Sequence, residues 1–205
     1  MFRMPLTYFW DSPEDNKMAR LLWGRMNLER AAALCYYGSE TRVARIVHHL
    51  KYYGRKDLAV EMGKLMGRKM GEHDFFRDMD AIIPVPLAKK RQRSRGYNQS
   101  QMIAEGLHAV TGLPVCNHVL ERTEFSASQT HLNVFERHEN VAKSFRLQDK
   151  LMETDWNCEG MNLKGKHLLL VDDVMTTGST IIACATQLQC IPDVKISVLT
   201  IGFTK

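Results

Sequence analysis

The chain has 205 residues, of which 44% are hydrophobic and 25% charged, and this composition excludes collagen-like, coiled-coil and wholly disordered proteins. Lys and Arg number 28 against 23 Asp and Glu, so the formal net charge is +5, which favours an anionic partner such as a phosphate, a nucleic acid or a membrane surface. The length predicts one domain with a core large enough to need no disulfide or metal.

Cysteines and apolar runs bear on the compartment. The 5 cysteines are scattered without a C-x-x-C pair, which argues against a zinc ribbon and favours free thiols in a reducing cytosol. No apolar run approaches the roughly 18 residues that span a bilayer, and the N-terminus has no recognisable secretory signal. We therefore expect a cytoplasmic protein that does not insert into a membrane.

The first 80 residues predict helices. Residues 43–50 and 58–66 each place apolar side chains on one helical face. Gly63, Gly67 and Gly71 recur every four residues along the second of these helices. Because glycine has no side chain, this spacing predicts the close approach of another backbone.

Strand and helix patterns alternate from about residue 80 to the end of the chain. Near-continuous apolar strands separated by helices are typical of a parallel sheet covered on both faces. The predicted fold class is therefore α/β, with strands at 81–86, 115–120, 167–171 and 194–203 and helical faces at 103–110 and 181–188. Residues 122–145 have few apolar positions, and a segment of this length is usually a functional lid or disordered.

The strongest functional signal follows the apolar strand at 167–171. Asp172 and Asp173 come directly after it, and a hydroxyl-rich loop then opens a helix: Thr176, Thr177, Gly178, Ser179 and Thr180. Ligands of open α/β sheets bind at the carboxyl ends of strands, and free N–H groups at a helix N-terminus bind phosphate. The carboxylates cannot share that phosphate, so they must meet a neighbouring polar group, such as a sugar diol. The sequence predicts a phosphorylated sugar as the ligand; the alternative is an Asp-rich turn with a Thr or Ser helix cap.

This run matches neither the P-loop nor the dinucleotide-binding fingerprint. It resembles the phosphoribosyl pyrophosphate (PRPP) motif of the type I phosphoribosyltransferases. The resemblance implies that Asp172 and Asp173 bind the ribose hydroxyls and that residues 176–180 bind the 5′-phosphate.

Five basic residues fall within positions 89–95, directly after the strand at 81–86. Since this segment and the acid pair each follow a strand, both should lie at one rim of the sheet. The pyrophosphate group of PRPP carries several negative charges, so we expect it to bind there, at Lys90, Arg91, Arg95 and Gly96. A solvated charged face is the alternative.

A wider set of residues, from about Cys35 to Phe203, is similar to the ComF family, which is associated with natural competence. The similarity is carried by His49–Gly54, Pro84–Leu87, Arg91–Ser100 and, in a stretch that forms a lid in the family, Gln129, Arg137, Asn140 and Phe145. It implies a linker or helical extension over residues 1–34 and a type I phosphoribosyltransferase-like domain over residues 35–205, with a long flexible loop. Family members commonly carry a four-cysteine zinc ribbon ahead of the linker, which this sequence lacks.

The resemblance implies transfer of ribose 5-phosphate from PRPP to an acceptor, with release of pyrophosphate. Asp172 and Asp173 would stabilise the positive charge of the transition state and would hold Mg²⁺ indirectly, through Mg–PRPP. Arg137 is the cationic catalytic candidate on the lid, although a salt bridge to Glu136 or Glu139 explains it equally well.

A second function stays open, in which the fold is a non-catalytic module that binds PRPP or a nucleotide and acts in DNA uptake beside a competence helicase. Residues 89–95 would then contact a DNA backbone, but Tyr97 is the only nearby aromatic residue, which disfavours single-stranded DNA. Lys51 and Tyr52 are expected to be an ordinary helix-end lysine and a packing tyrosine. The partners considered are PRPP, single-stranded DNA, a competence helicase and a second copy of the chain.

Overall fold

The computed structural model describes residues 4–123 and 144–204 and has a four-stranded sheet at its centre. All strand pairs in this sheet are parallel. The strand order is β1 (Ala31–Tyr37), β8 (Lys195–Thr204), β7 (His167–Met175) and β2 (Ala81–Pro84). The α/β class with a central parallel sheet is thus confirmed.

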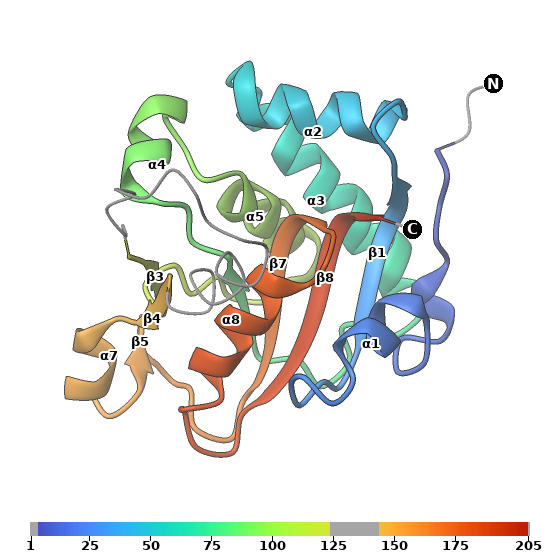
Figure 1. The fold of residues 1–205 in the computed structure, drawn as a ribbon. Coiled ribbons are helices and arrows are strands. Elements are labelled where there is room, and N and C mark those ends of the chain that lie inside the picture. The colour runs from blue at the N-terminus through green and yellow to red at the C-terminus, as the bar shows by residue number, and fades with distance from the viewer. Residues whose placement is uncertain (1–3, 124–143, 205) are drawn as a thin grey trace, which may run out of the picture.

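Helices cover both faces of this sheet (Figure 1), as a sheet with buried strands on both sides requires. Helix α5 (Gln99–Thr111) packs on β7 and β2, with α3 (Lys56–Gly71) behind it. Helix α8 (Ser179–Leu188) lies on the opposite face, and α2 (Arg42–Tyr52) runs beside the carboxyl edge. Across the described residues, none of the helices is long and apolar enough to cross a membrane.

The contact between α3 and α5 is unusually close. A Cβ atom built on Gly63 would lie 2.1 Å from the carbonyl oxygen of Ile103, and one on Gly67 would lie 3.0 Å from the Val110 side chain. The close approach of another backbone predicted from the glycine spacing is confirmed at Gly63, whereas the close neighbour of Gly67 is a side chain. It is not found at Gly71, where a Cβ would meet no described atom within 4 Å. The contact fixes α5, whose first turn reaches the functional site.

The N-terminal residues pack into the same core as the sheet. Short helices η1 (Phe9–Asp11) and α1 (Lys17–Leu22) bury residues against β1. Asn16 caps α1 and also donates a hydrogen bond of 2.8 Å to the carbonyl of Ala31. The division predicted between residues 34 and 35 falls within β1.

Two predicted segments take different forms in the structure. The strand expected at 115–120 is reduced to a single parallel bridge between Val115 and Ile82. The chain then forms β3 (Leu120–Arg122), which pairs antiparallel with β4 (Phe145–Leu147), followed by α7 (Asp149–Glu153), β5 (Asn157–Cys158) and β6 (Met161–Asn162). The basic segment expected as a loop is a helix, α4 (Lys89–Arg95). Gln129, Arg137 and Asn140 of the predicted lid lie outside the described residues.

Candidate functional site

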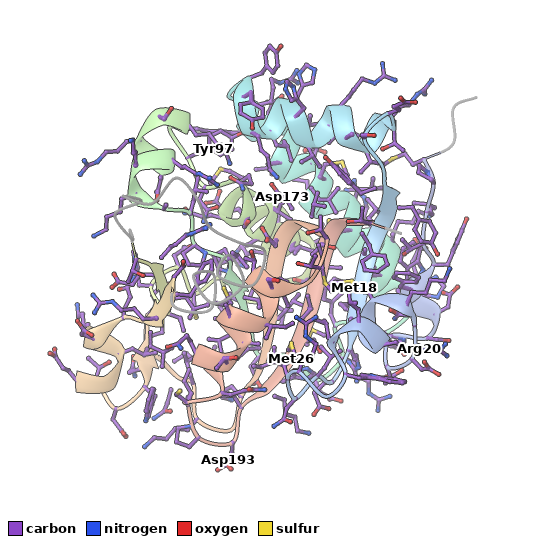
Figure 2. The ribbon with its side chains drawn as sticks, viewed as in Figure 1. Met18, Arg20, Met26, Tyr97, Asp173 and Asp193 are labelled. Atoms are coloured by element: carbon purple, nitrogen blue, oxygen red, sulfur yellow. The ribbon has the colours of Figure 1, made fainter. Side chains whose placement is uncertain are left out.

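The carboxyl edge of the sheet opens into a cavity of about 690 Å³. Figure 2 shows Asp173 at this edge, beside α5, while Asp193 lies in the turn at the opposite end of the sheet. Polar side chains of the lining come from β7, the loop that follows it, the start of α8, and from α2, α4, α5, β1 and β3. The acid pair, the hydroxyl loop and the basic segment therefore meet at one rim, as expected from their positions after parallel strands.

Asp172 and Asp173 are the buried acids of this cavity, 9% and 4% exposed. The hydroxyl of Ser100 donates to Oδ1 of Asp172 at 2.9 Å, and the backbone N–H of Asp173 donates to the same oxygen at 2.8 Å. Burial, and then the negative charge of Asp173, raise the pKa of Asp172 to about 7. A carboxyl group held in this way is sensitive to any cation that enters the cavity.

Asp173 has a cation beside it. Nζ of Lys51, at the end of α2, lies 3.0 Å from Oδ2 of Asp173, and Nε2 of Gln99 donates to the same oxygen at 3.2 Å. Gln99 in turn accepts a hydrogen bond from the guanidinium of Arg95. The sequence favoured an ordinary helix-end role for Lys51, whereas the structure places it in the site. Helices α2 and α5 thereby meet at one buried carboxylate, and α4 is linked to it through Gln99.

The hydroxyl loop has the backbone form of a helix entry. Gly178 adopts a φ of +78°, which favours glycine, and α8 begins at the next residue. The hydroxyls of Thr177 and Ser179 lie 2.9 Å apart, and Arg25 donates to the carbonyl of Thr177 at 3.1 Å. Of residues 176–180, Thr176 and Thr180 line the main cavity. These two residues therefore share a cavity with the acid pair, at the N-terminal end of α8, where a helix favours an anion.

The basic helix α4 has no buried residue. Arg91 and Arg95 line the cavity, whereas Lys90 and Gly96 are not part of its lining. Gly96 ends the helix with a φ of +79°. The structure thus brings two of the four residues predicted for pyrophosphate to the same cavity as the acid pair.

Comparison with known proteins finds relatives that carry similar names. No family model matches the chain. The DNA utilization protein YhgH of Salmonella typhimurium is 30% identical over 139 residues, which cover 66% of this chain and 56% of that protein. Competence protein F of Haemophilus influenzae is 34% identical over 102 residues, 50% of this chain and 41% of that protein. Competence protein ComFC of Bacillus subtilis is 29% identical over 100 residues, 49% of this chain and 34% of that protein. The chain belongs to the ComF family.

This ComF-family chain spans about half the length of these relatives: 56% of the Salmonella protein, and less of the other two. The names of these relatives describe DNA utilization and competence. The family resemblance inferred from the motifs is therefore confirmed, while the activity of this ComF chain rests on its site.

Several site residues of the ComF chain were not assigned from its sequence. Arg122, at the end of β3, lines the cavity, as do Gln99 and Ser100 from the first turn of α5. Tyr52 lines it as well and is 69% exposed. Tyr97, expected near the basic segment, is instead buried, and its hydroxyl donates to the carbonyl of Leu50. The one available signal was the resemblance over Arg91–Ser100, which included Gln99 and Ser100 without giving them a role.

The oxygens of the acid pair decide whether a divalent cation fits there. Its contacts engage Oδ1 of Asp172 and Oδ2 of Asp173, and the other oxygen of each accepts no hydrogen bond from the described residues. Over residues 4–123 and 144–204 no group of three or more His, Cys, Asp or Glu side chains could hold a metal by itself. This donor set fits a hard cation that keeps most of its waters or takes ligand oxygens, as Mg²⁺ does, and does not fit an all-protein cage.

Proposed function

We propose that this ComF-family chain is a type I phosphoribosyltransferase-like protein that binds PRPP with Mg²⁺ and transfers ribose 5-phosphate to an acceptor. The observation that carries the proposal is the meeting of three features in one cavity of about 690 Å³: the buried acid pair, the hydroxyl loop and the arginines of α4. A ligand with a diol between two phosphate groups would meet all three features.

Each part of PRPP has a partner in this arrangement. The unengaged oxygens of Asp172 and Asp173 would accept hydrogen bonds from the ribose hydroxyls. The 5′-phosphate would bind the loop at 176–180 at the start of α8. Arg91 and Arg95 of the cavity lining would bind the pyrophosphate, with Lys90 in the first turn of the same helix and Gly96 at its C-terminal end.

In the proposed reaction the bond between ribose C1 and the pyrophosphate oxygen breaks, and the acceptor forms the new bond to C1. The pyrophosphate leaves with the electron pair of the broken bond. The carboxylates of the acid pair stabilise the positive charge that develops on the ribose ring. Mg²⁺, when bound with PRPP, would neutralise charge on the leaving group. Arg137, outside the described residues, remains a predicted further cation.

Calorimetric titration of the whole chain with PRPP, with and without Mg²⁺, tests the proposal. We expect Mg²⁺-dependent binding that is lost in Asp172→Asn/Asp173→Asn, since neutral amides neither pair with Mg²⁺ nor accept from the diol as carboxylates do. Asp193→Asn, at the opposite end of the sheet, is the matched control and should bind as the natural chain does. Absence of PRPP binding by the natural chain would contradict the proposal, and pyrophosphate release with a panel of bases would establish turnover.

A second candidate is a non-catalytic module that binds PRPP or a nucleotide and acts in DNA uptake, with single-stranded DNA or a helicase as its partner. The names of the relatives support a role of this kind. The specific observation in its favour is a pair of exposed aromatic residues, Tyr52 and Tyr53, 69% and 63% exposed, beside the basic helix. The guanidinium of Arg95 lies 6.0 Å from the centre of the Tyr52 ring. Exposed rings next to cations are a common platform for single-stranded bases.

Fluorescence anisotropy with a labelled single strand tests this second candidate. We expect binding that weakens steeply with salt and falls by about thirtyfold or more in Tyr52→Ala/Tyr53→Ala, because each of two stacked bases contributes about 1–3 kcal/mol. Tyr8→Ala, which removes another exposed tyrosine in the N-terminal segment, is the control. If PRPP binds but no pyrophosphate is released, and DNA binds through these rings, the module is favoured over the enzyme.

A further inference from the structure

Two arginines from separate elements face the cavity without a counter-ion. Arg91 of α4 and Arg122 of β3 both line it. Within residues 4–123 and 144–204, neither has a carboxylate oxygen within 4.0 Å. Burial, and then the positive charge of Arg91, lower the pKa of Arg122. Arg91 is exposed and Arg122 is half-buried. Two like charges at one cavity raise the free energy of the empty site, and an anion between them would lower it.

The other two cations of the cavity lining each have a side-chain partner. Lys51 is paired with Asp173, and Arg95 donates to Gln99. On the paired strand, Arg146 forms an ion pair with Glu121. Among the described cations of the cavity lining, Arg91 and Arg122 therefore have neither a carboxylate nor a side-chain amide oxygen as a partner, whereas Lys51 and Arg95 each have one.

Arg122 is held in place by its surroundings. Its guanidinium lies 5.0 Å from the ring centre of Phe145, which is its partner in the β3–β4 register. Phe145 is buried, and β4 packs on α8, the helix that begins at the hydroxyl loop. An arginine fixed against a buried ring loses less conformational entropy on binding an anion than a free surface arginine does.

We propose that Arg91 and Arg122 form a two-arginine subsite for one phosphate group of a pyrophosphate or diphosphate ester. A dianionic tetrahedral phosphate carries two negative charges and presents acceptor oxygens in several directions, so it can meet two guanidinium groups at once. The subsite adds Arg122, from outside the basic segment, to the residues that recognise the ligand. Its identity as the pyrophosphate end of PRPP rests on the proposed function.

Four alanine variants test the subsite: two in it, one control on α4, and one control on β4, the strand paired with β3. Arg91→Ala and Arg122→Ala are compared with Arg93→Ala on α4 and Arg146→Ala on β4, neither of which lines the cavity. Each is titrated calorimetrically with PRPP, inorganic pyrophosphate and ribose 5-phosphate in the presence of Mg²⁺. We expect the subsite variants to bind PRPP and pyrophosphate about tenfold more weakly or worse and ribose 5-phosphate within about twofold, because a hydrogen bond to a charged group contributes about 1.5–3 kcal/mol.

Two further measurements separate a binding role from a folding role. Arg122→Lys keeps the charge, and we expect it to fold normally and to recover part of the affinity for pyrophosphate without the two-point contact. The double variant Arg91→Ala/Arg122→Ala should lose less than the sum of the single losses, because both residues hold the same phosphate. Equal affinities for pyrophosphate in the subsite and control variants would overturn the inference, as would an equal loss for ribose 5-phosphate. If the natural chain binds pyrophosphate through these arginines but does not bind PRPP, the proposed function fails and the subsite stands.

Discussion

The acid pair and the basic helix α4 face each other across the same cavity, but they are held in place by different means. Asp172 and Asp173 belong to a buried strand and are held by hydrogen bonds from α5, which is itself fixed by its close contact with α3. Helix α4 has no buried residue, and its Arg95 is hydrogen-bonded to Gln99 of α5. We infer that the buried side of the site, at the acid pair, is built by folding, whereas the exposed side, at α4, is completed by a ligand.

Substitution of Gly63 should give the largest effect, because it disturbs the helix pair that supports the acid pair. In Gly63→Ala the new Cβ would lie 2.1 Å from the carbonyl oxygen of Ile103, so α3 and α5 must move apart. We expect the free energy of unfolding in urea to fall by about 3 kcal/mol or more.

Gly71→Ala on the same helix is the control. Its Cβ would meet no described atom within 4 Å, so we expect no loss of stability. Equal stabilities of the two variants would mean that the close contact is not what supports the buried side of the site.

Asp172→Asn should remove the free-energy cost of keeping a charged carboxylate buried. The pKa of Asp172 is raised from 3.8 to about 7, so the folded chain binds this proton more tightly than the unfolded chain. The contribution of this group to stability is therefore fully present below about pH 4 and is lost as the pH rises to about 7. We expect Asp172→Asn to lose this pH dependence and, at pH 8, to be more stable than the natural chain by roughly 2–3 kcal/mol. Urea unfolding across this range measures it.

Asp193→Asn, on the turn at the far end of the sheet, should keep the natural pH profile. If Asp172→Asn followed the same profile as this control, burial of Asp172 would not be the source of the pH dependence.

Lys51→Met tests the connection between α2 and the acid pair. The variant leaves the buried Asp173 without its cation, while the methionine keeps most of the packing of the lysine stem. We expect a loss of about 1–2 kcal/mol in urea unfolding, less than for a fully buried pair because the Lys51 side chain is 29% exposed.

Lys64→Met, which breaks the exposed pair with Glu61, should cost no more than about 0.5 kcal/mol. Equal losses in the two methionine variants would make the Lys51 contact an ordinary surface pair, as its sequence suggested.

Sequence reasoning reached the parts of the site that are contiguous in the chain. Asp172, Asp173 and the hydroxyl loop follow one apolar strand, and parallel strands bring their carboxyl ends together, so their position at one edge could be predicted. The cation at Lys51 could not, because only the packing of α2 against the sheet edge brings it to Asp173. Arg122 is likewise placed by a two-stranded pairing with a distant segment.

The basic segment and the strand at 115–120 were misjudged in form for local reasons. Apolar periodicity cannot reveal α4, since the segment has no apolar face, but Lys, Arg and Gln favour helix and Gly96 supplies its left-handed end. At 115–120 the apolar pattern indicates burial without indicating which residues are paired, and one bridge to Ile82 is formed.

The smallest effect on stability should come from Arg95→Ala, and it bears most directly on how α4 is held. The variant removes the hydrogen bond to Gln99, and since α4 buries no residue we expect a change in unfolding free energy below about 0.5 kcal/mol.

The helix itself should open more often, because its contacts with the rest of the fold are few. Limited digestion with trypsin, which cuts after Lys and Arg, should therefore cleave within 89–93 several-fold faster in Arg95→Ala than in Arg146→Ala, which removes an exposed arginine outside α4. Magnesium pyrophosphate should slow cleavage at these positions in both variants, since a ligand that bridges α4 and β3 replaces the lost contact. Cleavage at 89–93 that is the same with and without pyrophosphate would contradict this expectation. It would mean that α4, like the buried side of the site, is fully formed before any ligand binds.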